Sequence, residues 1–221
     1  MIQTVLSPNQ KKFIVFFVSN PYLKKTFYLT GGTCLSEFYL RHRYSEDLDF
    51  FSEKEINITS ITSLLKQSKK KLGYKEIDFQ TSFNRNIYQL IFTKKDFLKA
   101  EFTYFPFESV DKRIEKDGLI IDSLKDIAIN KIFTIIQNPR GRDYYDLYFI
   151  LKKTNWDLTD LLKLARIKFD YRIDYLQIGS QLIRFNEFKD DPIIIDKKNY
   201  LKEIDIFFKD ISNNLKDKII K

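Results

Sequence analysis

The sequence predicts an α+β protein with a mixed or antiparallel sheet in its first part and helices in its second. Three consecutive segments alternate polar and apolar residues, and polar turns at 84–86 and 94–96 separate them. Strands joined in this way form an antiparallel meander. Beyond Gly118, apolar residues recur every three or four positions, which is the period of a helix. The expected division is an α/β lobe over residues 1–120 and a helical lobe over residues 121–221.

Turn and cap residues set the expected bounds of the individual elements. Gly31 and Gly32 end a short apolar strand. Ser123, followed by Asp126 at the third position, resembles a capping box at the start of a helix, and Pro139 ends that helix. The expected strands are residues 27–29, 47–51, 74–81, 87–93 and 97–105. The expected helices are residues 11–18, 33–40, 59–72, 123–137, 142–153, 158–169, 173–188 and 198–218.

Composition limits the possible classes of function. No apolar run approaches the roughly 20 residues of a membrane helix, the start of the chain lacks the layout of a signal peptide, and the single Cys34 rules out an internal disulfide. We therefore expect a cytoplasmic protein without a membrane segment. The net charge of +8 favours polyanions such as nucleotides or RNA. A genome rich in Lys, Asn and Ile codons would produce the same charge, so both interpretations stay open.

The segment Ser45–Phe51 carries two acidic residues in strand alternation. Residues i and i+2 of a strand point to the same face. The carboxylates of Asp47 and Asp49 are therefore expected side by side, with Leu48 and Phe50 in the core. Neighbouring carboxylates repel each other, and a cation that prefers oxygen ligands, such as Mg²⁺, would remove the repulsion. The alternative is an exposed acidic strand without a ligand.

Two further features could complete such a site. Gly31, Gly32 and Thr33 lie between a strand and a helix, where free backbone amides favour a phosphate. A Gly-Gly pair before a helix is, however, more often only a turn. Glu101 lies in the last strand of the expected meander. If that strand lies beside the one with Asp47, three carboxylates could bind two metal ions for a phosphoryl displacement.

A second group of charged residues lies in the expected helical lobe. Asp143 and Asp146 are three positions apart on one helix and face the same way. Lys131, on the preceding helix, is expected to be partly buried. It could contact a phosphate, or the three charges could form an ion-pair network that joins the two helices. Arg140 and Arg142 flank the break between these helices and are expected to be exposed.

Together these motifs resemble the signature series of the AbiEii/AbiGii-type toxin nucleotidyltransferases, within the DNA-polymerase-β-like nucleotidyltransferase superfamily. The resemblance rests on Gly31–Thr33, Arg41–Phe51, Asp126–Lys131 and Arg142–Tyr148. The motifs occur in the family's order and span residues 28–151. Each is short, but the combination is specific. It implies a nucleotidyltransferase-like N-terminal lobe followed by a helical C-terminal lobe.

The resemblance also assigns roles to the matching residues. The implied catalytic residues are Asp47, Asp49, Lys131 and Asp143, with Asp146 as structural partner. The implied nucleotide-binding residues are Gly31, Gly32, Thr33, Arg43 and Lys131. The implied metal ligands are Asp47, Asp49 and Glu101. Two positions depart from the usual pattern, because Thr33 replaces a Ser and Glu101 is longer than an Asp.

The function implied by the resemblance is Mg²⁺-dependent transfer of a nucleoside monophosphate from an NTP to an acceptor. RNA, specifically tRNA, is the expected acceptor, and Arg140 and Arg142 are candidates to contact it. The protein would be the toxin of a toxin–antitoxin or phage-defence system with a cognate antitoxin. The alternatives are a protein or small-molecule acceptor, or a non-catalytic partner-binding protein of the same fold. His42 is expected to be a polar loop residue at the entrance of the site, not a base.

Overall fold

The structure, a computed structural model, describes residues 4–188, 193–196 and 198–216. The chain forms two compact units. Unit 1 consists of residues 1–39, 45–108 and 112–122, and unit 2 of residues 40–44, 109–111 and 123–221. The main boundary follows residue 122, close to the expected one, whereas the short segments 40–44 and 109–111 of the expected first lobe belong to unit 2.

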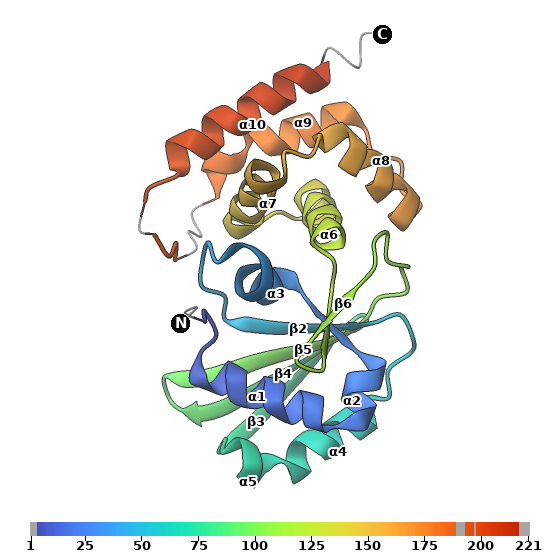
Figure 1. The fold of residues 1–221 in the computed structure, drawn as a ribbon, viewed down its shortest axis with the longest axis vertical. Helices are drawn as coiled ribbons and strands as arrows, with labels where there is room; N and C mark the ends of the chain where they lie inside the picture. Colours follow the sequence, from blue (N-terminus) through green and yellow to red (C-terminus); the bar gives the residue numbers. More distant parts are fainter. Residues whose placement is uncertain (1–3, 189–192, 197, 217–221) are drawn as a thin grey trace. The chain divides into compact units, whose positions relative to one another are not determined.

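Unit 1 is built on a mixed sheet that has seven strands within the described residues, in the order β3-β4-β5-β2-β1-β7-β6 (Figure 1). The strands are β1(Tyr28–Thr30), β2(Asp47–Ser52), β3(Glu76–Ser82), β4(Arg85–Thr93), β5(Asp96–Tyr104), β6(Ile114–Lys116) and β7(Leu119–Ile121). The strands β3, β4 and β5 form the expected antiparallel meander. The strand β5 pairs in parallel with β2, which is antiparallel to β1. The predicted α+β class with a mixed sheet is confirmed.

Helices lie on both sides of this sheet (Figure 1). The helices of unit 1 are α1(Pro8–Ser19), α2(Pro21–Thr26), α3(Gly31–Leu35), the π-helical turn η1(Ser36–Leu40), α4(Ile58–Gln67) and α5(Lys69–Leu72). Phe17 of α1 stacks on Phe50 of β2 with 4.2 Å between the ring centroids. Tyr88 of β4 hydrogen-bonds Thr62 of α4 at 2.7 Å. The helix α3 lies on the other side of β2 (Figure 1).

Local signals explain where these elements differ from the expected bounds. The helix α1 begins earlier than expected because Ser7 and Gln10 form a reciprocal capping box. The expected helix 59–72 is divided at Ser68, and Gly73, at φ +84°, ends its second part. The helix α2 and the β6–β7 hairpin were not predicted, because elements this short carry too few residues to show a period.

Unit 2 is helical, as expected. Its elements are α6(Leu124–Gln137), α7(Gly141–Thr154), α8(Leu158–Phe169), α9(Tyr175–Ile183), the 3₁₀ turn η2(Phe185–Glu187) and α10(Leu201–Lys216). The side chain of Asp174 caps α9, so this helix starts later than the expected residue 173. Residues 217–218 of the last expected helix lie outside the described residues. Among the helices that the structure describes, none combines the length and apolar character needed to cross a membrane.

Candidate functional site

Two carboxylates share one face of β2. Exposure alternates along the strand, with Asp47 and Asp49 half-buried and Leu48 and Phe50 fully buried. In the parallel pairing with β5, Asp49 lies opposite Glu101. Neighbouring strands are about 4.8 Å apart. The expected adjacency of these two strands is therefore confirmed, and three acidic residues meet on one side of the sheet.

The carboxylate of Glu101 is engaged by neighbours from the same sheet. Both its oxygens accept hydrogen bonds from Arg85 at 2.7 Å, and Thr103 donates to one of them at 2.8 Å. Burial opposes the charged form, but the hydrogen bonds and charge of Arg85 hold the pKa of Glu101 below its usual value. The described residues contain no group of three or more His, Cys, Asp or Glu side chains placed to hold a metal ion. Arg85 binds both oxygens of Glu101, and the role of Glu101 as a metal ligand therefore stays a prediction.

Two cations lie among the acidic residues of this face. Lys99 lies opposite Asp47 and forms an ion pair with it at 3.1 Å. Hydrogen bonding to Glu101, together with the charges of Glu101, Asp49 and Asp47, raises the pKa of Arg85. The shared orientation of the Asp47 and Asp49 carboxylates fits a hard divalent cation with oxygen ligands, such as Mg²⁺.

Gly31 leaves the space that the carboxylate of Asp49 occupies. A Cβ built on Gly31 would lie 2.2 Å from Asp49 Oδ2, far inside van der Waals contact. Gly31 also has φ +73°, in the left-handed region that favours glycine. The first glycine of the Gly-Gly pair is therefore required by a protein carboxylate, a reason that the sequence alone did not suggest.

Thr33 joins the start of α3 to the strand that carries the carboxylates. Its hydroxyl donates a hydrogen bond to the main-chain oxygen of Asp47, and the residue is buried. Sequence reasoning placed this hydroxyl on a phosphate, whereas the structure shows it holding β2 in position. Gly32, also buried, is the second residue of α3. These contacts fix the main chain of Asp47 relative to the Gly31–Gly32 turn.

Unit 2 holds a buried cluster of charges around Asp146. Lys131 Nζ lies 2.7 Å from Asp143 Oδ1 and 2.6 Å from Asp146 Oδ2, and both aspartates are fully buried. Lys131 is 7% exposed. Of the two alternatives left open by the sequence, this geometry is that of an ion-pair network between α6 and α7.

Arg43 is the second cation of this cluster. Its Nε and Nη2 atoms bind the two oxygens of Asp146 at 2.6 and 2.8 Å, and the residue is 3% exposed. Despite burial, the charges of Arg43 and Lys131 hold the pKa of Asp146 well below its usual value. The resemblance assigned Arg43 to the nucleotide, whereas its guanidinium fork is matched to a carboxylate of its own unit.

His42 is a loop residue, as expected, but it is buried within unit 2. The residue is 6% exposed, and its Nε2 atom lies 2.7 Å from Asp146 Oδ1. Hydrogen bonds between His42 O and Ile195 N and between Tyr44 N and Ile193 O hold the segment 40–44 in unit 2. Burial lowers the pKa of His42, outweighing the opposing effect of Asp146.

The buried imidazole predicts a loss of stability in mild acid. A lowered pKa in the folded state means that the unfolded chain binds the proton first, so stability falls as pH drops below about 6.5, by at most about 1.4 kcal/mol per pH unit. His42 is the only histidine in the sequence. Urea unfolding of wild type between pH 7 and pH 5 should show this slope, and His42→Asn should remove most of it. An equal slope in both proteins would contradict the assignment.

Arg140 belongs to the same cluster and not to a free basic surface. Its side chain is half-exposed, but Nε lies 3.0 Å from Asp143 Oδ2 and its main-chain N–H donates to the same oxygen. Arg140 is the N-cap residue of α7, and the side chain of Asp143 accepts its main-chain N–H. Arg142, in the first turn of the helix, is of intermediate exposure. Of the two arginines expected to contact an acceptor, only Arg142 has no ion pair with a described residue.

Sequence reasoning missed the two cations of the unit 1 site. Lys99 is two positions before Glu101 in the same strand, so the period of the strand could have placed it on the carboxylate face. Arg85 could not have been found in this way, because its approach to Glu101 depends on the pairing of β4 with β5.

Both the sequence and the fold of this chain are similar to those of known proteins. Residues 15–218 match the family described as nucleotidyl transferase AbiEii toxin, Type IV TA system. An uncharacterized protein of Aquifex aeolicus (strain VF5) is 34% identical over 190 residues, which is 83% of this chain and 84% of that protein. Two solved Helicobacter pylori structures, one provisionally titled a nucleotidyltransferase and the other JHP933, have TM-scores of 0.61 and 0.59 at 20% identity. They cover 96% of this chain and 97% and 94% of theirs, and they share its fold.

Proposed function

Because the chain belongs to the AbiEii family of nucleotidyl transferase toxins of Type IV toxin–antitoxin systems, it is a nucleotidyltransferase, and we propose that it transfers a nucleoside monophosphate from an NTP to RNA in the presence of Mg²⁺. Transfer RNA is the first candidate acceptor. The observation that carries the proposal is the Asp47–Asp49 pair on one face of β2, beside the Gly31–Thr33 turn. The family also implies an antitoxin partner.

Each residue of the unit 1 site has a part in this reaction. An acceptor hydroxyl attacks the α-phosphorus of the NTP, and pyrophosphate leaves. Asp47 and Asp49 would hold Mg²⁺, which when bound stabilises the negative charge that develops on the phosphate oxygens. Lys99 orients Asp47, and Gly31 leaves room for Asp49. The backbone amides of the Gly31–Thr33 turn are the proposed contacts for the triphosphate.

The intact carboxylate pair argues against the non-catalytic alternative. Two like charges on one half-buried face repel each other, and a bound cation removes this repulsion. The assignment of RNA as acceptor rests on the net charge of +8 and on the family resemblance. A protein hydroxyl or a small molecule as acceptor is therefore kept as an outcome of the test.

The proposal is tested by supplying the purified protein with each α-labelled NTP, with Mg²⁺ or EDTA, and with tRNA, other RNA, protein or a small-molecule extract as acceptor. We expect label on tRNA only in the presence of the metal. Label on protein or a small molecule would replace the RNA acceptor but retain nucleotidyl transfer. No transfer to any acceptor with any NTP would overturn the proposal.

Gly31→Ala should abolish transfer through the displacement of Asp49. The new Cβ would occupy the position of Asp49 Oδ2, and the left-handed backbone adds roughly 1–2 kcal/mol of strain. Gly73→Ala is the matched control, since Gly73 has φ +84° but faces only the flexible end of Lys12. Gly73→Ala, which carries the backbone strain without the clash, should keep its activity, and only Gly31→Ala should lose activity. Normal activity of Gly31→Ala would contradict the geometry.

A further inference from the structure

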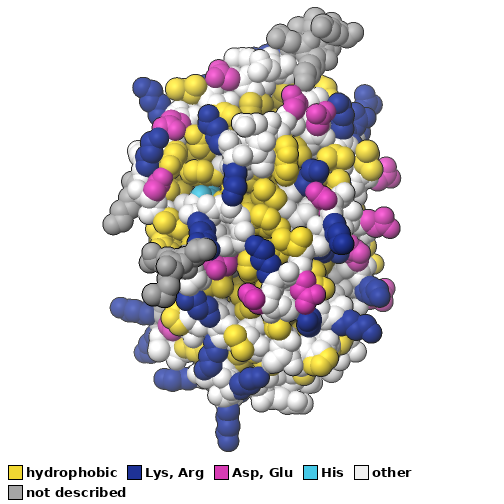
Figure 2. Space-filling view, viewed as in Figure 1, with side chains coloured by type: hydrophobic (Ala, Val, Ile, Leu, Met, Phe, Trp, Pro, Cys, Tyr) yellow, Lys and Arg dark blue, Asp and Glu magenta, His cyan; other side chains and the backbone are white. Residues whose placement is uncertain are grey.

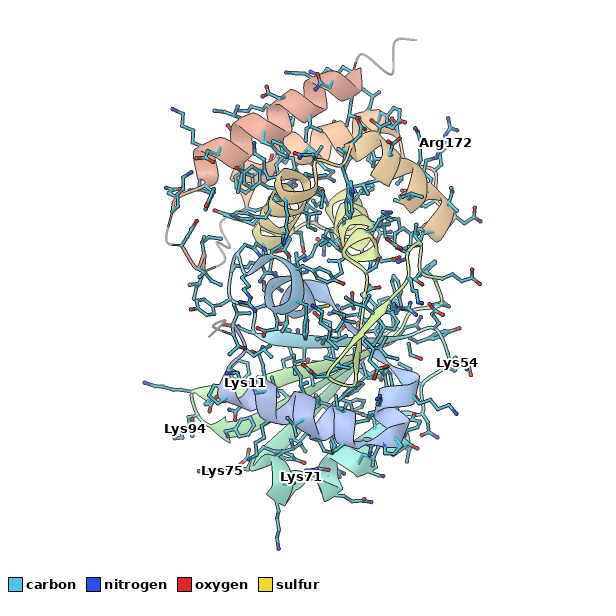
Figure 3. The ribbon with its side chains drawn as sticks, viewed as in Figure 1. Lys11, Lys54, Lys71, Lys75, Lys94 and Arg172 are labelled. Atoms are coloured by element: carbon cyan, nitrogen blue, oxygen red, sulfur yellow. The ribbon has the colours of Figure 1, made fainter. Side chains whose placement is uncertain are left out.

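One end of unit 1 carries lysines that have no part in the site described above. They lie on α1, on α5, before β3 and in the β4–β5 turn, and all are exposed. We call this surface the lysine end, and it consists of Lys11, Lys12, Lys71, Lys75, Lys94 and Lys95. Figure 3 shows the labelled members Lys11, Lys71, Lys75 and Lys94 at the same end of the unit.

Short contacts join these segments into one surface. Asn9, at the start of α1, donates to both carboxylate oxygens of Asp96, next to the β4–β5 turn, at 3.1 and 3.0 Å. Lys12 Nζ lies 3.2 Å from the position of a Cβ on Gly73, between α5 and β3. The main-chain N–H of Lys75 bonds to β4 at 2.7 Å, in the strand that leads into the turn. The segments that carry these lysines therefore lie close together in space, although they are far apart in the sequence.

The positive charge of the lysine end is not compensated. No ion pair between its six lysines and another residue that the structure describes is present. The stretches 9–12, 69–76 and 93–96 together contain eight lysines but only two carboxylates, Glu76 and Asp96. On the face drawn in Figure 2, Lys and Arg side chains outnumber acidic ones over α1 and α5. A uniform bias of the genome toward lysine would not by itself gather the charge at one end.

The β4–β5 turn connects the lysine end to the strand that carries Lys99. The parallel strands β2 and β5 both begin at this end, and Lys95 precedes Lys99 by four residues, or roughly 13 Å of strand. Lys99 in turn binds Asp47. The helices α1 and α5 of the lysine end lie on the Phe50 side of the sheet, opposite the side that carries Asp47 and Asp49.

We propose that the lysine end binds the phosphate backbone of a nucleic-acid acceptor. This inference rests on the proposed function. Lysine offers a compact charge on a flexible stem, which suits phosphates without reading base edges. An acidic protein partner fits less well, because the cores of protein interfaces are depleted in Lys. Binding is therefore expected to be independent of sequence and strongly dependent on salt.

The test compares two triple variants of equal net charge. The first combines Lys11→Gln, Lys75→Gln and Lys94→Gln. The control combines Lys54→Gln, Arg172→Gln and Lys202→Gln, which are exposed residues outside the lysine end. Fluorescence anisotropy with a labelled single-stranded RNA of about 20 nucleotides, with tRNA and with a poly-glutamate peptide gives Kd over a range of salt concentrations. The first variant should raise Kd for both RNAs about tenfold and reduce the slope of log K against log salt by about 2–3.

The outcomes separate this inference from the proposed function. Equal RNA affinity of the two variants, or loss of poly-glutamate binding with RNA binding unaltered, would overturn the lysine end as a nucleic-acid surface. Nucleotidyl transfer to another acceptor would then still stand. Conversely, weaker RNA binding by the first variant, with no metal-dependent transfer by wild type, would support the surface and overturn the reaction.

Discussion

Replacing Asp49 with Asn is expected to lower the rate of nucleotidyl transfer by about a thousandfold or more, since stabilisation by a bound metal contributes several kcal/mol to the transition state. The amide keeps the size of the carboxylate, so it still fills the space beside Gly31. It removes the negative charge of Asp49, one of the two carboxylates that are proposed to hold Mg²⁺. Single-turnover transfer of labelled nucleotide at saturating Mg²⁺ measures the effect.

The fold should survive this change. Asp47 and Asp49 are like charges on one face of β2, so loss of one of them should leave the melting temperature of the metal-free protein unchanged or higher. Asp78→Asn is the matched control, because Asp78 is an exposed acid of the same sheet, paired in register with Gln89. If Asp49→Asn kept its activity, or if Asp78→Asn lost as much activity as Asp49→Asn, the assignment of Asp49 as a metal ligand would be contradicted.

The strand period carried most of the information that the sequence held about the unit 1 site. It placed Asp47 and Asp49 on one face and Leu48 and Phe50 in the core, and the structure has this arrangement. It could not show that Glu101 is neutralised by Arg85, because that contact joins two strands across the sheet. The reason for Gly31 was hidden in the same way, since Asp49 approaches it through the pairing of β1 with β2.

Helical elements were predicted because caps and apolar spacing are local, but their partners were not. The bounds of α8 agree with the prediction. The environment of His42 was missed, because Asp146 lies 104 positions away in the sequence. The composition of Arg41, His42 and Arg43 is that of an exposed polar segment. His42 and Arg43 are nevertheless buried, because both bind the buried carboxylate of Asp146 on a distant helix. Long-range ion pairs of this kind are set by the tertiary fold and leave no periodic signal.

Lys131→Met is expected to destabilise the protein by roughly 3–5 kcal/mol, as for removal of one partner from a buried ion pair. Asp143 and Asp146 are both 0% exposed, and the variant removes the positive charge of Lys131 that lies beside them. For a chain of this length the melting temperature should fall by about 6–20 °C. Lys163→Met is the control, since its pair with Asp160 is exposed and should contribute little to stability.

Nucleotide affinity measured on the same variant decides between the two roles that the sequence left open for Lys131. In the ion-pair role, folded Lys131→Met binds NTP as wild type does, and a second change, Asp143→Asn, recovers part of the lost stability because it removes the unpaired charge. In the phosphate role, NTP affinity falls while the melting temperature hardly changes, because Arg43 and Arg140 still neutralise the two aspartates. The fully buried carboxylates and the 2.6 and 2.7 Å contacts lead us to expect the first result.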